Sequence, residues 1–98
     1  MPYRIQYSIR AEEHLRGLTA RQRSLVLDTI DRQLTHQPTV ETKNRKPMRQ
    51  NPLAAWELRI GGLRVYYRLD EAEPLVQVLA IGTKRRHQVY LGERVVEL

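Results

Sequence analysis

The chain has 98 residues and a net charge of +6, with 17 Lys and Arg against 11 Asp and Glu, and it contains no cysteine. A chain of this length supports one modest core, so we expect residues 1–98 to form a single domain. The absence of cysteine excludes disulfides and thiolate zinc sites, and the histidines, His14, His36 and His87, are too scattered to predict a metal or a cofactor. No stretch approaches the roughly 20 apolar residues of a membrane span or the apolar core of a signal peptide, which predicts a cytoplasmic protein with no membrane partner.

The positive charge is concentrated in the middle of the chain. Residues 43–68 contain seven basic side chains and one acidic side chain, whereas the segments before and after them are close to neutral. Such a local excess is expected of a surface that binds phosphate or an acidic partner. The alternative is a solvated surface that only keeps the protein soluble.

The first part of the chain predicts a strand followed by two helices. Residues 3–7 alternate apolar and polar side chains, as a short strand does. Residues 8–18 predict a helix with one apolar face, formed by Ile9, Ala11, Leu15 and Leu18. Thr19 followed by Gln22 is a capping-box pattern that predicts the start of a second helix, which ends before Pro38. We expect its apolar face, with Leu27, Ile30 and Leu34, to point toward the core. We therefore expect an antiparallel helical hairpin packed on a sheet.

A long basic loop is predicted from residue 37 to residue 54. The segment has three prolines and no sustained periodicity, and it carries four cations, Lys43, Arg45, Lys46 and Arg49. Long loops without secondary structure are uncommon in compact domains and are often functional. We expect these cations to bind a ligand; the alternative is a mobile connection.

Residues 56–69, WELRIGGLRVYYRL, predict a hairpin with a two-residue turn at Gly61-Gly62. The register then pairs the apolar residues on one face, as Trp56 with Tyr67, Leu58 with Val65 and Ile60 with Leu63. On the other face it pairs Arg59 with Arg64 and Glu57 with Tyr66, and Arg68 lies further along. Two arginines directly across a ladder repel each other, so a bound anion or Glu57 must relieve this pair. One face is thus expected to be core and the other a basic platform.

The last third of the chain begins with an acidic turn at residues 70–74. LVQVLAIG, residues 75–82, is apolar enough to predict a central strand covered on both faces. The basic run TKRRH at residues 83–87 follows it and brings charge to the end of the strand. The closing GERVVEL is expected to pack as a short tail or to wait for a partner.

The side chains that remain suit RNA cleavage by internal attack. The sequence has no P-loop, GxGxxG or GxSxG motif. When a ribose 2′-hydroxyl attacks the adjacent phosphorus, the reaction needs positive charge on the phosphorane, a group that takes the 2′ proton and a group that protonates the leaving 5′ oxygen. Guanidinium groups meet the first need. A tyrosine among cations, Tyr66 or Tyr90, has a lowered pKa in this interpretation and meets the second; the alternative is a ring that fills the core edge.

The order of these elements, with WELRIGGLRVYYRL and VLAIGTKRRHQVY, resembles the RelE/ParE superfamily of toxins from bacterial toxin-antitoxin systems over nearly the whole chain. The resemblance implies an α+β fold: a small antiparallel sheet with an N-terminal strand, a helical hairpin packed on one face, three further strands and a short C-terminal segment. RelE-like members are mRNA endonucleases of the ribosomal A site, and ParE-like members inhibit DNA gyrase.

The resemblance also assigns roles by position. Arg64 matches the strand arginine that contacts the scissile phosphate in such toxins. Lys84 or Arg86 matches the basic residues after the last strand, and Tyr90 matches the tyrosine near the C-terminus. Arg59 and Glu57 fall where such toxins carry strand lysines, so the catalytic set departs from the family pattern. The expected catalytic residues are Arg59, Arg64, Lys84, Arg86 and Tyr90. The expected RNA-binding residues are Lys43, Arg45, Lys46, Arg49, Tyr66, Arg68, Arg85 and His87.

Three functions are compatible with this pattern. The first is a ribosome-dependent mRNA endonuclease that uses Arg, Lys and Tyr without a metal. The second is a ParE-like inhibitor of gyrase that performs no chemistry, and the third is an inactive member. All three imply a cognate antitoxin, a partly disordered acidic partner for the basic face and the apolar tail. The first adds mRNA and the ribosome as partners, with operator DNA contacted only through the antitoxin.

Overall fold

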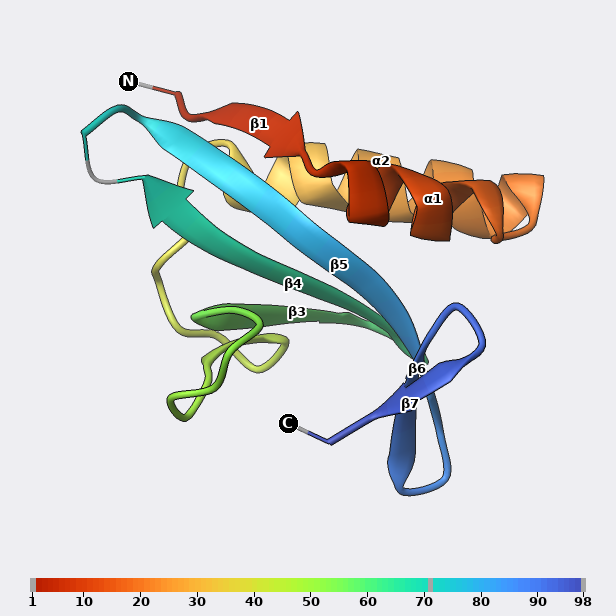
Figure 1. Cartoon of the computed structure of the whole chain (residues 1–98). Helices are drawn as coiled ribbons and strands as arrows, with labels where there is room; N and C mark the ends of the chain where they lie inside the picture. The colour runs from red at the N-terminus through yellow and green to blue at the C-terminus, as the bar shows by residue number, and fades with distance from the viewer. Residues whose placement is uncertain (1, 71, 98) are drawn as a thin grey trace.

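The structure, a computed structural model, describes residues 2–70 and 72–97. Two helices cover one face of a twisted sheet, which confirms the predicted α+β class (Figure 1). The elements follow in the order β1 (Arg4–Tyr7), α1 (Ile9–Arg16), α2 (Ala20–Leu34), β2 (Arg45–Pro47), β3 (Trp56–Ile60), β4 (Leu63–Asp70), β5 (Leu75–Arg85), β6 (Gln88–Leu91) and β7 (Arg94–Val96).

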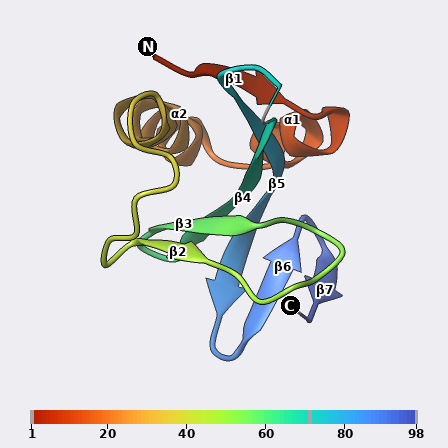
Figure 2. The ribbon, with the colours of Figure 1, turned by 90° about the vertical axis from the view of Figure 1, so that its left-hand side faces the viewer.

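Both helices begin at side-chain caps. Ser8 Oγ accepts the N–H of Ala11 at 3.0 Å where α1 begins. At the start of α2, Thr19 and Gln22 form the predicted capping box. The two helices form the predicted hairpin on one side of the sheet (Figure 2).

The apolar faces of the helices agree with the prediction except at one residue. Leu18 and Leu27 are partly buried, and the fully buried positions include Ala11, Ile30 and Leu34. Ile9 was expected on the same face, but it is 76% exposed. The prediction was wrong there because Ile9 lies two positions before Ala11, which turns it about 200° around the helix.

The sheet is antiparallel along the order β2-β3-β4-β5-β6-β7, and β1 pairs with β5 in parallel. β5 is the central strand: β4 pairs with one of its edges, while β1 and β6 share the other edge, at residues 75–78 and 83–85. The predicted apolar strand is confirmed and continues three residues beyond Gly82, so that TKR belongs to the strand. No helix in the described part of the chain is long and apolar enough to span a membrane.

The hairpin of β3 and β4 has the predicted register at every pair. Trp56 lies opposite Tyr67, Leu58 opposite Val65 and Arg59 opposite Arg64. Gly61 has a φ of 58°, whereas the φ of Gly62 is not positive. A positive φ at the first central residue alone is the pattern of a type II′ turn, which glycine permits at no steric cost.

The sheet has a core on each face. Leu58, Val65 and Tyr67 belong to the main core under the helices. On the opposite face, which was expected to be a solvated platform, Tyr66, Ala80 and Leu91 are buried with Met48, Leu53, Ala54, Val89 and Val96 packed against them. This second core forms because the loop before β3 and the strands β6 and β7 fold over the sheet from two sides (Figure 1).

A bulge in β5 and the N-terminus of α1 are joined by hydrogen bonds. The register shifts between the pairs Tyr66–Ala80 and Tyr67–Val78, so Leu79 is the extra residue. Its carbonyl accepts the hydroxyl of Ser8 at 2.9 Å. His14 Nδ1 accepts the N–H of Ile81 at 3.1 Å, and burial lowers the pKa of His14, which favours the neutral ring that can accept this bond.

Gly82 lets β6 cross close to β5. A Cβ at this position would lie 2.8 Å from Leu91 Cδ2 and 2.9 Å from the carbonyl oxygen of Tyr90. The C-terminal residues were expected to be a tail, but they form β7, which pairs with β6. Val96 packs into the second core, whereas Val95 is 46% exposed.

The segment expected to be a structureless basic loop contains the short strand β2, which pairs with β3. Arg45 on β2 is only 4% exposed. Its guanidinium donates to the carbonyls of Gln37 and Val40 and to the side chain of Gln33. Arg45 was predicted to bind RNA; this prediction was wrong, because its guanidinium is buried and bonded within the chain.

We predict that Arg45→Met lowers the free energy of unfolding by about 3 kcal/mol, because it removes three partly buried hydrogen bonds from a charged donor. Lys46→Met is the matched control, since Lys46 forms an exposed ion pair with Glu41 at 3.2 Å and such pairs contribute about 1 kcal/mol or less. Urea denaturation measures both variants. Equal losses would contradict the structural role of Arg45.

Candidate active site

A cleft of about 360 Å³ lies on the second face of the sheet, between β3 and the turn and strands that follow β5. The strands β3 to β7 and the turn between β5 and β6 line it. Its residues are Glu57, Arg59, Tyr66, Lys84, His87, Gln88, Val89, Val95, Val96 and Glu97. The cleft thus brings together two predicted site residues from the hairpin, Arg59 and Tyr66, and two from the run TKRRH, Lys84 and His87.

Strand alternation and pairing position the charged groups of the cleft. Glu57 and Arg59 are two residues apart on β3 and therefore share a face. Lys84 pairs with Val89 across β5 and β6, and His87 lies in the turn between these strands. Arg59 of the hairpin, Lys84 near the end of β5 and His87 after it line one cleft, which β6 and β7 close where they fold back over the sheet.

An ion pair anchors the cleft. Arg59 Nε donates to Glu57 Oε1 at 2.7 Å, and the side chain of Glu57 is only 14% exposed. This contact confirms that Glu57 relieves the pairing of Arg59 with Arg64. Because Arg59 uses its Nε for the carboxylate, both of its terminal nitrogens remain available for a phosphate.

Tyr66 lies under the cleft with a buried hydroxyl. The residue is 0% exposed, and its hydroxyl has no hydrogen-bond partner at acceptable geometry among the described residues. Burial raises the pKa of Tyr66, and the Glu57 carboxylate raises it further, against smaller opposing effects of Arg64 and Arg59. The predicted lowering of the Tyr66 pKa was wrong, because desolvation and a carboxylate outweigh the cations.

Arg64 lies on this face of the sheet but does not line the cleft. It is 9% exposed, and its Nη1 donates to the carbonyls of Gly61 and Leu63 at 2.7 and 2.9 Å. The guanidinium is therefore held at the hairpin turn. A phosphate contact requires Arg64 to leave these two carbonyls.

The predicted terminal tyrosine lies on the other face. Tyr90 pairs with Thr83, one residue before Lys84. Because consecutive side chains of a strand point to opposite faces, Tyr90 lies on the face opposite to that of Lys84. Its hydroxyl donates to Gln88 at 3.2 Å, and Arg85 lies over its ring, 5.0 Å from the centroid. Arg86 is exposed in the turn with a φ of 58°. The expected convergence of Tyr90 with the hairpin cations is not present.

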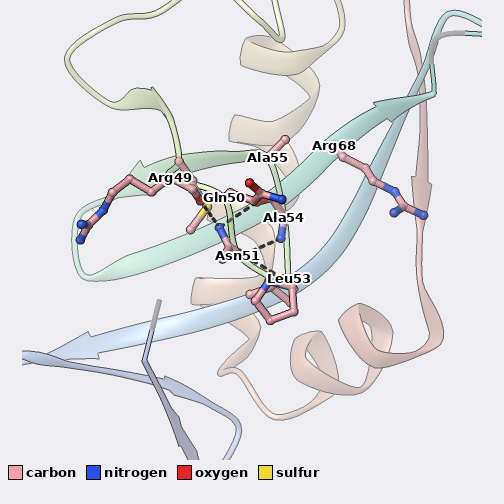
Figure 3. Close-up of a pocket in the computed structure, with 9 residues that line it drawn as sticks. Arg49, Gln50, Asn51, Leu53, Ala54, Ala55 and Arg68 are labelled. Carbon is pink, nitrogen blue, oxygen red and sulfur yellow. Dashed lines mark hydrogen bonds between the residues drawn. The ribbon is translucent and has the colours of Figure 1, made fainter.

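Of the remaining predicted RNA contacts, Arg49 and Arg68 line a different hollow, beside the loop before β3, and Lys43 lines neither. Lys43, Arg49 and Arg68 are exposed, and Arg68 Nε donates to Gln77 at 2.9 Å. Figure 3 shows Arg49 and Arg68 on opposite sides of the loop that precedes β3. These side chains surround the second face with positive charge.

Glu57 and His87 give the cleft a carboxylate and an imidazole, one pair of groups that can accept and donate protons. The sequence reasoning treated Glu57 as a departure and His87 as an RNA contact. Thirty residues separate them, and only the fold-back after Gly82 brings them to one cleft. The sequence did contain one signal for Glu57, because the hairpin register pairs it with Tyr66, next to Arg59. No cluster of His, Cys, Asp or Glu suited to a metal occurs in residues 2–70 and 72–97.

We predict that Tyr66→Phe leaves the free energy of unfolding unchanged or raises it, because the hydroxyl is buried without a partner. Tyr67→Phe is the matched control: the Tyr67 hydroxyl donates to the buried Pro38 carbonyl, so its loss costs about 1–3 kcal/mol. Thermal and urea unfolding of the pair measure the difference. An equal loss in both variants would show that Tyr66 has a partner in solution.

Comparisons with known proteins agree with the fold. No protein-family model matches the sequence, and no curated protein matches it significantly. Among solved structures, a chain of the toxin-antitoxin complex RelBE2 from Mycobacterium tuberculosis superposes with a TM-score of 0.74 at 24% identity, covering 86% of this chain and 93% of that one. The protein therefore has the RelE-like toxin fold, as its resemblance to that superfamily predicted.

Proposed function

We propose that this protein is the toxin of a toxin-antitoxin pair and that its cleft cleaves mRNA on the ribosome by 2′-hydroxyl attack. The single observation that carries the proposal is the gathering of Glu57, Arg59, Lys84 and His87 in one cleft. These groups supply each requirement of the reaction: a proton acceptor, a proton donor and positive charge for the phosphorane.

In this mechanism Glu57 takes the proton of the 2′-hydroxyl as its oxygen attacks the adjacent phosphorus. The bond from phosphorus to the 5′ oxygen breaks, and protonated His87 gives its proton to that oxygen. The products are a 2′,3′-cyclic phosphate and a 5′-hydroxyl, so protons and charge balance without a water or an outside reagent. Arg59 and Lys84 stabilise the equatorial oxygens of the phosphorane.

The contacts of Arg59 favour these roles. Its bond to Glu57 Oε1 fixes the carboxylate and leaves Oε2 free to accept the 2′ proton. Arg64 supplies a further guanidinium once it leaves the carbonyls of Gly61 and Leu63. Arg86 and Tyr90, which were expected to be catalytic, are proposed instead to contact the ribosome or RNA from outside the cleft.

The partners follow from the fold and the charge. The similar solved structure is a toxin-antitoxin complex, and this chain has a net charge of +6. We propose that an acidic antitoxin covers the cleft and that the complex contacts operator DNA only through the antitoxin. We propose the cytoplasm as the location of both proteins.

Inhibition of gyrase is the second candidate. Glu57 and Arg59 favour it, since they fall where RelE-like toxins carry strand lysines, and a surface without those lysines can bind a protein without chemistry. Loss of catalysis is the third candidate, for the same reason.

Primer extension on a reporter mRNA in a reconstituted translation system tests the proposal. We expect cuts at A-site codons with the wild type and a fall of about 10²-fold or more with Glu57→Gln or His87→Ala, because each removes one proton-transfer group. The matched controls are Glu41→Gln and His36→Ala, which change an exposed carboxylate and an exposed imidazole outside the cleft and should cut like the wild type.

An intact message in the presence of folded wild-type protein would overturn the endonuclease proposal. A supercoiling assay with purified gyrase then separates the other two candidates. Inhibition would indicate a gyrase poison, and no effect would indicate an inactive member.

A further inference from the structure

Two more hollows continue the cleft along the second face of the sheet. The middle hollow, about 270 Å³, shares Glu57 and Arg59 with the cleft. The end hollow, about 410 Å³, shares Met48, Arg49 and Asn51 with the middle hollow. The shared lining residues place the three hollows next to one another in a row, here called the groove, that leads from the proposed cleavage site to the loop before β3.

Cations line the whole groove. Lys84 lies at the cleft, Arg59 at the first junction, Lys46 and Arg49 at the middle hollow, and Arg68 at the end hollow. The carboxylates among the lining residues are Glu57 and Glu97, and Glu57 is already paired with Arg59. A groove with this balance fits a flexible chain of phosphates.

The end hollow has a different character from the cleft. Its walls are mostly apolar, and they include Met48, Pro52, Leu53 and Ala54. Gln50 adds an exposed amide that makes no hydrogen bond with any side chain or backbone group described in the structure (Figure 3). An apolar wall beside one free amide suits a nucleobase, which needs a surface for its flat ring and a donor and acceptor for its edge.

The loop that forms the end hollow is fixed by Asn51. Its Nδ2 donates to the carbonyls of Arg49 and Ala54 at 2.6 and 3.0 Å, and its Oδ1 accepts the N–H groups of Leu53 and Ala54 at 2.8 and 3.0 Å (Figure 3). Leu53 and Ala54 also pack on the second core. The hollow is therefore formed before any ligand arrives, and little loop ordering opposes binding.

We propose that the end hollow is a nucleobase subsite, in which Gln50 reads the base of a nucleotide that flanks the scissile phosphate of single-stranded RNA. Arg49 and Arg68 extend away from each other on either side of the loop, and each is proposed to hold a different phosphate along the RNA (Figure 3). This inference rests on the proposed function, because it takes RNA as the substrate of the cleft. It assigns base selection to the loop and chemistry to the cleft.

The first test maps cut sites by sequencing the 5′ ends of mRNA fragments in the translation system. Gln50→Ala should weaken the base preference at one flanking position about tenfold, which corresponds to about 1.4 kcal/mol. Arg49→Ala should slow cutting at all sites alike. The controls are Gln37→Ala and Arg21→Ala, two exposed residues outside the groove, and neither should change the profile.

The second test needs no cleavage. Glu57→Gln protein is titrated with RNA decamers of a single base type while the side-chain amide signals of Gln50 and Asn51 are followed by NMR. We expect one base type to shift the Gln50 signal at lower concentration than the others. If RNA shifts cleft residues but leaves Gln50 unmoved, and Gln50→Ala keeps the wild-type profile, the subsite is wrong while the endonuclease stands. If RNA shifts neither, the subsite proposal fails, and the primer-extension result alone decides the endonuclease proposal.

Discussion

The pairing of β3 with β4 is the constraint on which the rest of the molecule depends. In a strand, a slip of one residue moves every side chain to the other face. Here the turn at Gly61 fixes a register in which Leu58 and Val65 face the helices, while Glu57 and Arg59 face the cleft. A slipped register would bury the ion pair under the helices and expose the apolar residues, so the same contacts that form the main core also orient the proposed site.

The second core turns this face from a surface into a cleft. Gly82 permits β6 to approach β5 closely, and the chain then returns over the sheet through β7. The apolar residues of this layer exclude water around Tyr66, and the charged residues gather at its rim. Burial therefore raises the pKa of the tyrosine that was expected to become a phenolate, and it leaves proton transfer to Glu57 and His87 in our proposal.

Local patterns in the sequence were sufficient for both helices, the hairpin and the central strand, but not for β2 and β7. The capping box at Thr19, the Gly-Gly turn and the apolar run of β5 each act over a few residues, and each predicted the structure correctly. The site was harder because it depends on contacts between distant segments. Nothing near Arg45 in the sequence distinguishes it from Lys46, yet one is buried against backbone carbonyls and the other is exposed. In the same way, the position of Tyr90 follows from a pairing of β5 with β6 that begins only after Gly82.

The most direct test of the proposed chemistry replaces one ribose. A reporter mRNA carries a single 2′-deoxynucleotide on the 5′ side of a mapped cut, and cleavage is followed by primer extension with translating ribosomes. Internal attack predicts that this cut disappears while neighbouring cuts remain, and that cuts in the unmodified message leave a 2′,3′-cyclic phosphate and a 5′-hydroxyl. Cleavage of the deoxy-substituted site at the normal rate would contradict the roles given to Glu57 and His87.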